Sequence, residues 1–278
     1  MQREYAELST MFYDFSKAVG QSINGDIEYY SKKLEKVSGL VLEAGVGTGR
    51  MLIPLIKKGI RTIGVDSSPE MLEQCKINLK KHKASALLYE QDLIELSTAE
   101  KYDAIIMPAG SFCLLPREKA EIVLHKYYEH LNPGGKIIID LEEAPVSFVE
   151  GAETLRVLQL SADRALQLCS RNGGIDWLAQ ETSYINRYEL IEKGKVIQTE
   201  ISNLSLFWYE LEEFKMLLIL AGYEDISCET GYGRPEGDFV TFIAYKPDNL
   251  FSKKKQVLVQ GSQPERPVQS MFYAMIFL

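Results

Sequence analysis

The sequence is poor in cysteine and histidine, the residues on which structural zinc sites and disulfide frameworks depend. Only four cysteines and three histidines occur among its 278 residues. They are Cys75, Cys113, Cys169, Cys228, His82, His125 and His130. No Cys-x-x-Cys pair is present and no histidine lies at zinc-ligand spacing from a cysteine, so we expect neither a metal site nor a disulfide framework. Each cysteine has apolar neighbours, which favours a small buried side chain over a nucleophile.

The sequence also lacks a long hydrophobic run and an excess of positive charge. Its longest uncharged stretch, Ala104 to Pro116, is too short to span a membrane. Arg3, Glu4 and Glu7 stand where a signal peptide would be apolar. The formal net charge of −8 opposes binding to a phosphate backbone. We therefore expect a globular, cytoplasmic protein with no nucleic-acid partner and no membrane association.

What the sequence does contain is a regular alternation of apolar strands and amphipathic helices. Two helices, over residues 3–19 and 26–37, are predicted before the first strand. Strands are predicted over residues 39–44, 62–65, 86–89, 102–107 and 136–141. Helices with one apolar face are predicted among them, over residues 51–56, 69–81 and 120–131. Apolar strands separated by helices are typical of a parallel sheet covered on both faces, so the fold class is α/β, doubly wound and Rossmann-like.

The pattern changes after Glu143. Residues 154–209 alternate as antiparallel strands do, with turns expected at Asn172-Gly173-Gly174 and Lys193-Gly194. A helix over 211–221 and strands over 223–228 and 239–245 then complete a seven-stranded, mostly parallel sheet. We predict one domain over residues 1–248 and a tail of unknown role over residues 249–278. The domain divides into N-terminal helices (1–37), a core (38–142), a small antiparallel β insertion (150–209), and the last helix and strands (210–247).

The segment from Val41 to Arg50 is the most informative part of the sequence. Gly45, Gly47 and Gly49 alternate at the end of a strand, where the missing Cβ atoms let a ligand approach the backbone. Asp66 ends the next strand, at the place where an acidic side chain accepts hydrogen bonds from both hydroxyls of a ribose. Together these features predict a nucleotide-like ligand.

Two residues decide between candidate cofactors. A dinucleotide fold requires a third glycine where Arg50 stands, and Glu43 beside the loop would repel a pyrophosphate. A carboxylate suits a ligand with an ammonium group and a sulfonium, which describes S-adenosylmethionine. A nicotinamide-dependent oxidoreductase is therefore the less favoured alternative.

On these motifs the sequence resembles the class I S-adenosylmethionine-dependent methyltransferases, over roughly residues 5 to 247. Five segments carry the resemblance, in family order: Glu43–Gly49, Asp66–Leu72, Gln91–Leu93, Met107–Phe112 and His130–Gly135. The resemblance implies that the glycine loop contacts the methionine part of the donor, that Asp66 binds the ribose, and that Met71 and Asp92 meet the adenine. The cofactor-binding residues that it implies are Tyr13, Glu43, Ala44, Gly45, Gly47, Asp66, Ser67, Met71, Gln91, Asp92, Leu93, Pro108 and Ala109.

The insertion resembles that of a small-molecule subgroup of the family, whose members often cover the donor with an N-terminal tyrosine. This implies a small-molecule acceptor, methylated on nitrogen or oxygen by in-line displacement. The catalytic residues are not identified by the resemblance, and Tyr13 and Ser111 are the candidates near the methyl group. A homo-oligomer is compatible with this interpretation.

Structural roles stay open for several of these residues. Asp66 and Asp92 could cap the turns that follow them, and Met71 could be a core residue. For Tyr13 the alternative is that its sole role is to pack the first helix against the sheet. A catalytically silent binding protein that retains the donor fold is the alternative from a different functional class.

Overall fold

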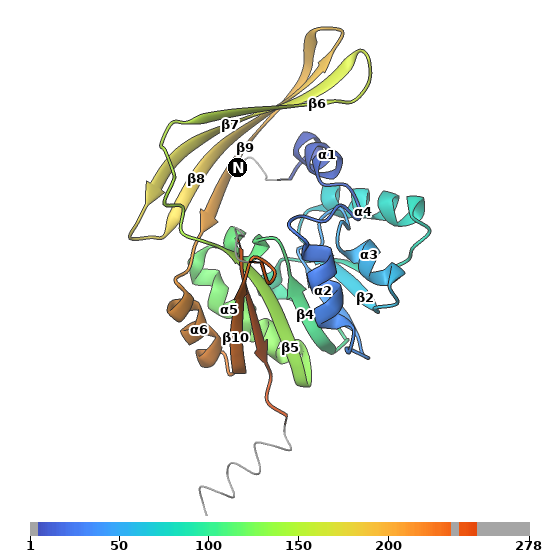
Figure 1. The fold of residues 1–278 in the computed structure, drawn as a ribbon. Coiled ribbons are helices and arrows are strands. Elements are labelled where there is room, and N and C mark those ends of the chain that lie inside the picture. The colour runs from blue at the N-terminus through green and yellow to red at the C-terminus, as the bar shows by residue number, and fades with distance from the viewer. Residues whose placement is uncertain (1–4, 235–238, 249–278) are drawn as a thin grey trace, which may run out of the picture.

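The structure is a computed structural model, which describes residues 5–234 and 239–248. Its centre is a seven-stranded sheet with the strand order β10-β11-β5-β4-β1-β2-β3 (Figure 1). The strands are β1 (Val41–Ala44), β2 (Thr62–Asp66), β3 (Leu88–Glu90), β4 (Tyr102–Met107), β5 (Leu131–Glu142), β10 (Glu224–Thr230) and β11 (Phe239–Tyr245). Only β11 runs antiparallel to its neighbours, β5 and β10. The predicted doubly wound α/β fold is confirmed.

Helices cover both faces of this sheet because the strands are apolar on both sides. The helices are α2 (Asp26–Leu34), α3 (Leu52–Lys57), α4 (Pro69–Lys81), α5 (Arg117–His130) and α6 (Leu211–Leu220). Val41 packs in one core with α2 and α3, whereas its neighbour Leu42 packs in the opposite core with α5 and α6. The alternating side chains of one buried strand thus hold helices on both faces.

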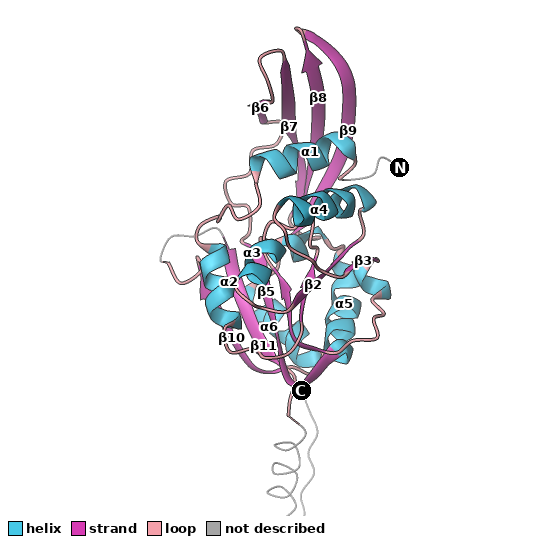
Figure 2. Ribbon diagram, turned by 90° about the vertical axis from the view of Figure 1, so that its right-hand side faces the viewer, coloured by secondary structure: helices cyan, strands magenta, loops and turns pink. Residues whose placement is uncertain are grey.

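The predicted insertion is a separate four-stranded antiparallel sheet with the order β6-β7-β8-β9. Its strands are β6 (Glu153–Gln159), β7 (Arg164–Asp176), β8 (Glu181–Glu192) and β9 (Lys195–Phe207). The first helix, α1 (Glu7–Ser16), packs on this sheet and not on the main one, since Leu8 and Phe12 share a core with Leu168 and Tyr188. Figures 1 and 2 show α1 lying between the insertion and α4.

Polar contacts fix both sides of α1. The Glu200 carboxylate on β9 accepts hydrogen bonds from the backbone N–H groups of Leu8 (2.6 Å) and Ser9 (3.2 Å), which lie in the first turn of the helix. On the other side, the Asp14 carboxylate accepts from the side-chain amides of Gln74 (3.0 Å) and Asn78 (2.6 Å) on α4. The helix therefore bridges the insertion and α4.

One expectation about local structure was wrong, and one predicted strand is longer than expected. Asn172-Gly173-Gly174 is not a turn, because β7 continues through it with an irregular register between Asn172 and Ile175. The Gly174 N–H donates to the Ser183 hydroxyl (2.9 Å), and a Cβ on Gly173 would lie 2.6 Å from the same oxygen, so the glycines accommodate a bulge. The expected strand over 136–141 begins earlier, at Leu131, where α5 ends.

The expected burial of the cysteines holds for two of the four. Cys75 and Cys113 are buried, whereas Cys169 is only half-buried and Cys228 is exposed on β10, near the edge of the main sheet. No helix in the described ranges is long and apolar enough to cross a membrane. The predicted tail, 249–278, lies outside the described residues.

Candidate donor-binding site

The glycine loop after β1 presents bare backbone at the carboxyl end of the main sheet. Gly45 (φ 70°) and Gly47 (φ 53°) adopt the left-handed conformation that glycine tolerates best. A Cβ on Gly45 would lie 3.6 Å from the Cβ of Ser111, and one on Gly47 would lie 4.0 Å from the Met71 sulfur. The loop therefore brings the segment after β4 and the start of α4 close to the end of β1.

Asp66 connects this loop to α4. One carboxylate oxygen accepts from the Gly47 N–H (2.8 Å) and the other from the Ser68 N–H (2.9 Å). Burial raises the pKa of Asp66, and these backbone hydrogen bonds oppose the shift. Ser68 caps α4 by accepting from the Met71 N–H (3.1 Å), so Asp66 supports the cap and at the same time lies at the cavity described next.

A cavity of about 380 Å³ lies between the strand ends, α1 and α5. It brings together ten of the predicted site residues from five separate segments of the chain. These are Tyr13, Gly45, Gly47, Asp66, Ser67, Met71, Gln91, Asp92, Leu93 and Ser111. Four predicted residues do not line it: Glu43, Ala44, Pro108 and Ala109. The volume is that of a small-molecule site.

Asp92 and Met71 combine the two roles considered for each. Asp92 accepts from the Ile94 N–H (3.1 Å) as the cap of a short 3-10 helix (Leu93–Glu95), yet its exposed side chain also lines the cavity. Met71 is buried on α4 and lines the cavity as well. Structural and binding roles are thus compatible at both positions.

Glu43 is a buried acid beside the loop with an unsatisfied oxygen. Its Oε2 atom has no hydrogen-bond partner among the residues that the structure describes. Burial raises its pKa to about 8, with Asp26 and Asp66 adding to the shift and the Arg50 guanidinium opposing it. An unpaired buried carboxyl is costly, so a cationic hydrogen-bond donor would be favourable beside it, although Glu43 lies behind the glycine loop and does not itself line the cavity.

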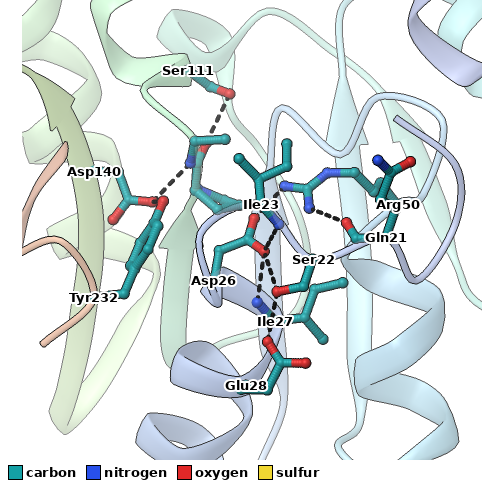
Figure 3. Close-up of polar contacts among 12 residues, drawn as sticks. Gln21, Ser22, Ile23, Asp26, Ile27, Glu28, Arg50, Ser111, Asp140 and Tyr232 are labelled. Atoms are coloured by element: carbon teal, nitrogen blue, oxygen red, sulfur yellow. Dashed lines mark hydrogen bonds and ion pairs between the residues drawn. The ribbon is translucent and has the colours of Figure 1, made fainter. Parts of the chain in front are cut away.

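Arg50, which stands where a dinucleotide fold has glycine, forms a buried ion pair with Asp26 (2.6 Å). It also donates to the backbone oxygen of Gln21 (3.0 Å). Asp26 further accepts from the N–H groups of Ile23 (2.8 Å) and Ile27 (2.7 Å), as Figure 3 shows. The network fixes the start of α2 against the glycine loop.

Tyr13 reaches the cavity from α1. Its ring meets the Tyr5 ring edge-on, with 6.4 Å between centroids, and the Lys17 ammonium lies 4.9 Å from the ring centroid. Burial raises the pKa of Tyr13. Its phenol is therefore neutral in the physiological pH range.

The segment after β4 is held in place by Asp140 on the neighbouring strand β5. The buried Asp140 carboxylate accepts from the Ala109 N–H (2.7 Å), and the Ser111 hydroxyl donates to the Pro108 oxygen (3.0 Å). Pro108 and Ala109 thus form the support of the cavity wall, while Ser111 faces the cavity.

Comparisons with known proteins agree with this geometry. Residues 41–135 match the model of the methyltransferase domain family. An uncharacterized methyltransferase of Geobacillus kaustophilus is 29% identical over 150 residues, which span 50% of this chain and 66% of that relative. A glycine/sarcosine N-methyltransferase of Aphanothece halophytica is 24% identical over 233 residues, spanning 79% of this chain and 81% of the relative. The X-ray structure of a sugar N-methyltransferase from Streptoalloteichus has a TM-score of 0.71 at 18% identity, covering 89% of this chain and 94% of that one.

Residues 41–135 therefore form a methyltransferase domain, and the chain has the fold of the class I S-adenosylmethionine-dependent methyltransferases. The family, the enzyme class and the cofactor predicted from the sequence are confirmed, and the nicotinamide-dependent alternative is set aside.

Sequence reasoning missed several residues of the methyltransferase cavity. They are Tyr5, Ser68, Met107, Leu114, Leu115, Pro116 and Lys119. Met107 and Ser68 lie inside two of the segments that carry the resemblance but were not singled out as site residues, and Tyr5 lies at the start of the range that the resemblance covers. The run from Leu114 to Lys119 carried no comparable signal, because an apolar turn before a helix is an ordinary feature of the fold.

Proposed function

We propose that this methyltransferase transfers a methyl group from S-adenosylmethionine to an amine nitrogen of a small molecule. The observation that supports the proposal is the cavity that joins the glycine loop, Asp66, Met71 and Asp92 to Ser111. The donor-recognition motifs and the loop after β4 thus border one space. When bound, the donor supplies an activated methyl group.

The methionine part of the donor would lie at the glycine loop. Gly45 and Gly47 leave space for it, and Glu43 would accept from its ammonium group through the oxygen that lacks a partner. Ala44, which is fully buried, would contribute through its backbone alone. Tyr13 would cover this part from α1.

The nucleoside part would lie over the ends of β2 and β3. Asp66 would accept from the ribose hydroxyls, because carboxylate oxygens bonded to Gly47 and Ser68 retain further acceptor capacity. Met71 would pack on the adenine and Asp92 would accept from its amino group. Ser67, Gln91 and Leu93 border the same part of the cavity.

The composition of the cavity wall favours an amine over a hydroxyl acceptor. A hydroxyl requires a base, whereas an amine in its neutral form brings its own lone pair. Among the described residues that line the cavity there is no histidine, and the Tyr13 phenol stays protonated. The glycine/sarcosine and sugar N-methyltransferases, with which this chain aligns over most of its length, also act on nitrogen.

The remaining task of the protein is alignment and exclusion of water. The contacts of α1 with Glu200 on one side and with Asn78 on the other place a helix over the cavity. The apolar side chains of Met107, Leu114 and Leu115 line the wall near Ser111. Pro108 and Ala109, which do not line the cavity themselves, would fix the position of the wall that contains Ser111.

Methyl transfer to matched probes tests the proposal. Formation of S-adenosylhomocysteine would be measured with pairs that differ only in the reacting group, namely aminosugars against their parent sugars and glycine against glycolate. We expect turnover of amines and none of their hydroxyl counterparts. Turnover of the hydroxyl compounds alone would contradict the proposal.

A variant pair locates the adenine part of the site. Asp92→Asn keeps the cap on the following turn but weakens acceptance from an adenine amino group, so we expect weaker binding of S-adenosylhomocysteine. Glu95→Gln changes an exposed acid in the same turn that does not line the cavity, and it should bind as the unmodified protein does. Equal losses in both variants would remove Asp92 from the site.

A further inference from the structure

Asp140 is a fully buried carboxylate on β5, in the middle of an apolar strand. Its oxygens accept hydrogen bonds from three donors: the Ala109 N–H (2.7 Å), the Tyr232 hydroxyl (2.7 Å) and the Thr241 hydroxyl (2.6 Å). The three donors come from the loop after β4, the turn after β10, and β11. Figure 3 shows Asp140 and Tyr232 below the loop that carries Ser111.

The loop above Asp140 has an unusual backbone. Ala109 (φ 56°) is one of the few residues other than glycine in the left-handed region, and Gly110 (φ 70°) follows in the same conformation. A Cβ on Gly110 would lie 2.8 Å from Glu142 Cγ and 2.9 Å from the Phe239 ring, so the segment is packed closely from beneath. This conformation costs free energy, and the hydrogen bond from Ala109 to Asp140 compensates for part of it.

The same loop borders the donor cavity. Ser111 donates both its N–H (3.3 Å) and its hydroxyl (3.0 Å) to the Pro108 oxygen, which makes Pro108–Ser111 a compact turn. Ser111 and Met107 line the cavity, and Ser111 lies opposite Gly45 of the glycine loop. A shift of Ala109 would therefore move the wall that faces the reacting groups.

We propose that Asp140 is a positioning residue for methyl transfer, which holds the Pro108–Ser111 turn in place without contacting donor or acceptor. The inference rests on the proposed function, because it assumes that this turn borders the transferred methyl group. Tyr232 and Thr241 fix the carboxylate from the opposite side, so that Asp140 cannot follow the turn if the turn moves.

A carboxylate suits this role better than an amide. Three N–H or O–H donors converge on it, and a carboxylate offers only acceptor sites. An asparagine offers a single, uncharged acceptor oxygen, so its hydrogen bond from the Ala109 N–H would be weaker and one of the two hydroxyls would have to turn round and accept from its NH2 group. The weaker hydrogen bond would affect the position of the Pro108–Ser111 turn and would leave the glycine loop and Asp66 unchanged.

The environment of Asp140 also predicts a pH dependence. Burial raises its pKa to about 6, while the hydrogen bonds from Thr241, Tyr232 and Ala109 oppose the shift. The titratable groups around it are Tyr29, Tyr30 and Tyr232, with Cys113 and Glu142 nearby, and burial raises the pKa values of the three tyrosines and the cysteine. Below pH 6 Asp140 is protonated, and its bond to the turn weakens.

Hydrogen exchange of the full chain, followed by mass spectrometry, tests the inference without knowledge of the acceptor. In the unmodified protein, amides in the peptide that contains Ala109–Ser111 should exchange faster at pH 5 than at pH 7.5, after correction for intrinsic rates. In Asp140→Asn the fast exchange should be present at both pH values. Asp103→Asn, at the opposite end of β4, is the matched control and should behave as the unmodified protein.

Two functional readouts distinguish positioning from general damage. In Asp140→Asn, affinity for S-adenosylhomocysteine should stay within about twofold, whereas kcat for the amine probe should fall roughly ten- to a hundredfold. Tyr232→Phe removes one donor and should show a smaller fall in kcat. If Asp140→Asn binds S-adenosylhomocysteine normally and shows unchanged hydrogen exchange and unchanged kcat, the inference is overturned. If the unmodified protein does not bind S-adenosylhomocysteine at all, the proposed function is contradicted instead.

Discussion

The Asp66 carboxylate accepts a hydrogen bond from the Gly47 N–H at 2.8 Å. This bond joins the end of β2 to the glycine loop after β1, two segments whose strands are paired in parallel. The two strongest sequence motifs therefore support one another physically. A ligand that reaches the Asp66 carboxylate also meets the bare backbone of the loop.

We expect Asp66→Ala to weaken binding of S-adenosylhomocysteine at least about tenfold, because hydrogen bonds to a charged group contribute roughly 1.5–3 kcal/mol each. The measurement is isothermal titration. Glu90→Gln is the matched control, since Glu90 pairs with Asp66 across β2 and β3 but is exposed and does not line the cavity. Unchanged affinity in Asp66→Ala would show that the ribose lies elsewhere.

Donor binding should release a proton through Glu43. The pKa of Glu43 is raised to about 8, so the acid is largely protonated at pH 7, and a nearby ammonium group would favour its ionised form. Affinity for S-adenosylhomocysteine should therefore rise between pH 6 and pH 8. Titrations in buffers of different ionisation enthalpy would measure the release directly.

Glu43→Gln is the control for this linkage, because it cannot ionise but keeps a similar shape. The variant should bind more weakly and release fewer protons than the unmodified protein under identical conditions. Equal proton release in both proteins would assign the effect to the ligand and remove Glu43 from the ammonium site.

Arg50→Met should destabilise the fold by about 3 kcal/mol, since it leaves Asp26 buried without its counter-charge. Urea unfolding monitored by circular dichroism would measure the change. The double variant with Asp26→Asn should recover part of the loss, because the uncompensated charge is removed while the bonds from Ile23 and Ile27 can still form. A loss below about 0.5 kcal/mol in Arg50→Met would be that of an ordinary surface substitution and would contradict a structural role for the pair.

Asp14→Ala should loosen α1 over the cavity, because it removes the acceptor for both Gln74 and Asn78. We expect faster dissociation of S-adenosylhomocysteine in stopped-flow experiments, with a smaller effect on its association. Glu73→Ala removes an exposed acid from α4 and should leave dissociation unchanged. If both variants released the ligand at the same rate as the unmodified protein, α1 would not cover the donor.

Much of the fold could be predicted because its determinants are local in the sequence. A few neighbouring residues were enough to predict three of its features: the strand at Ala104–Met107, the end of the helix before Asn132, and the glycine loop after β1. The prediction of a turn at Asn172–Gly174 was wrong because β-bulges and turns both favour glycine, so the sequence pattern is the same for the two. Only the pairing with Ser183 on the next strand distinguishes them.

The parts of the site that could not be predicted depend on contacts between distant segments. Arg50 was recognised as a departure from a dinucleotide motif, but its ion pair with Asp26 follows from the placement of α2. Asp140 was overlooked although it is the single charged residue between Ile137 and Leu141, a pattern that indicates a buried acid with partners. Its partner Tyr232 lies 92 positions away.

The most direct test of the central claim is isothermal titration of the purified protein with S-adenosylmethionine, S-adenosylhomocysteine and NADH, run side by side. The structure predicts one binding site for the two sulfur nucleosides, in competition with each other, and no binding of NADH. Binding of NADH alone, or of none of the three, would contradict the assignment of the cavity.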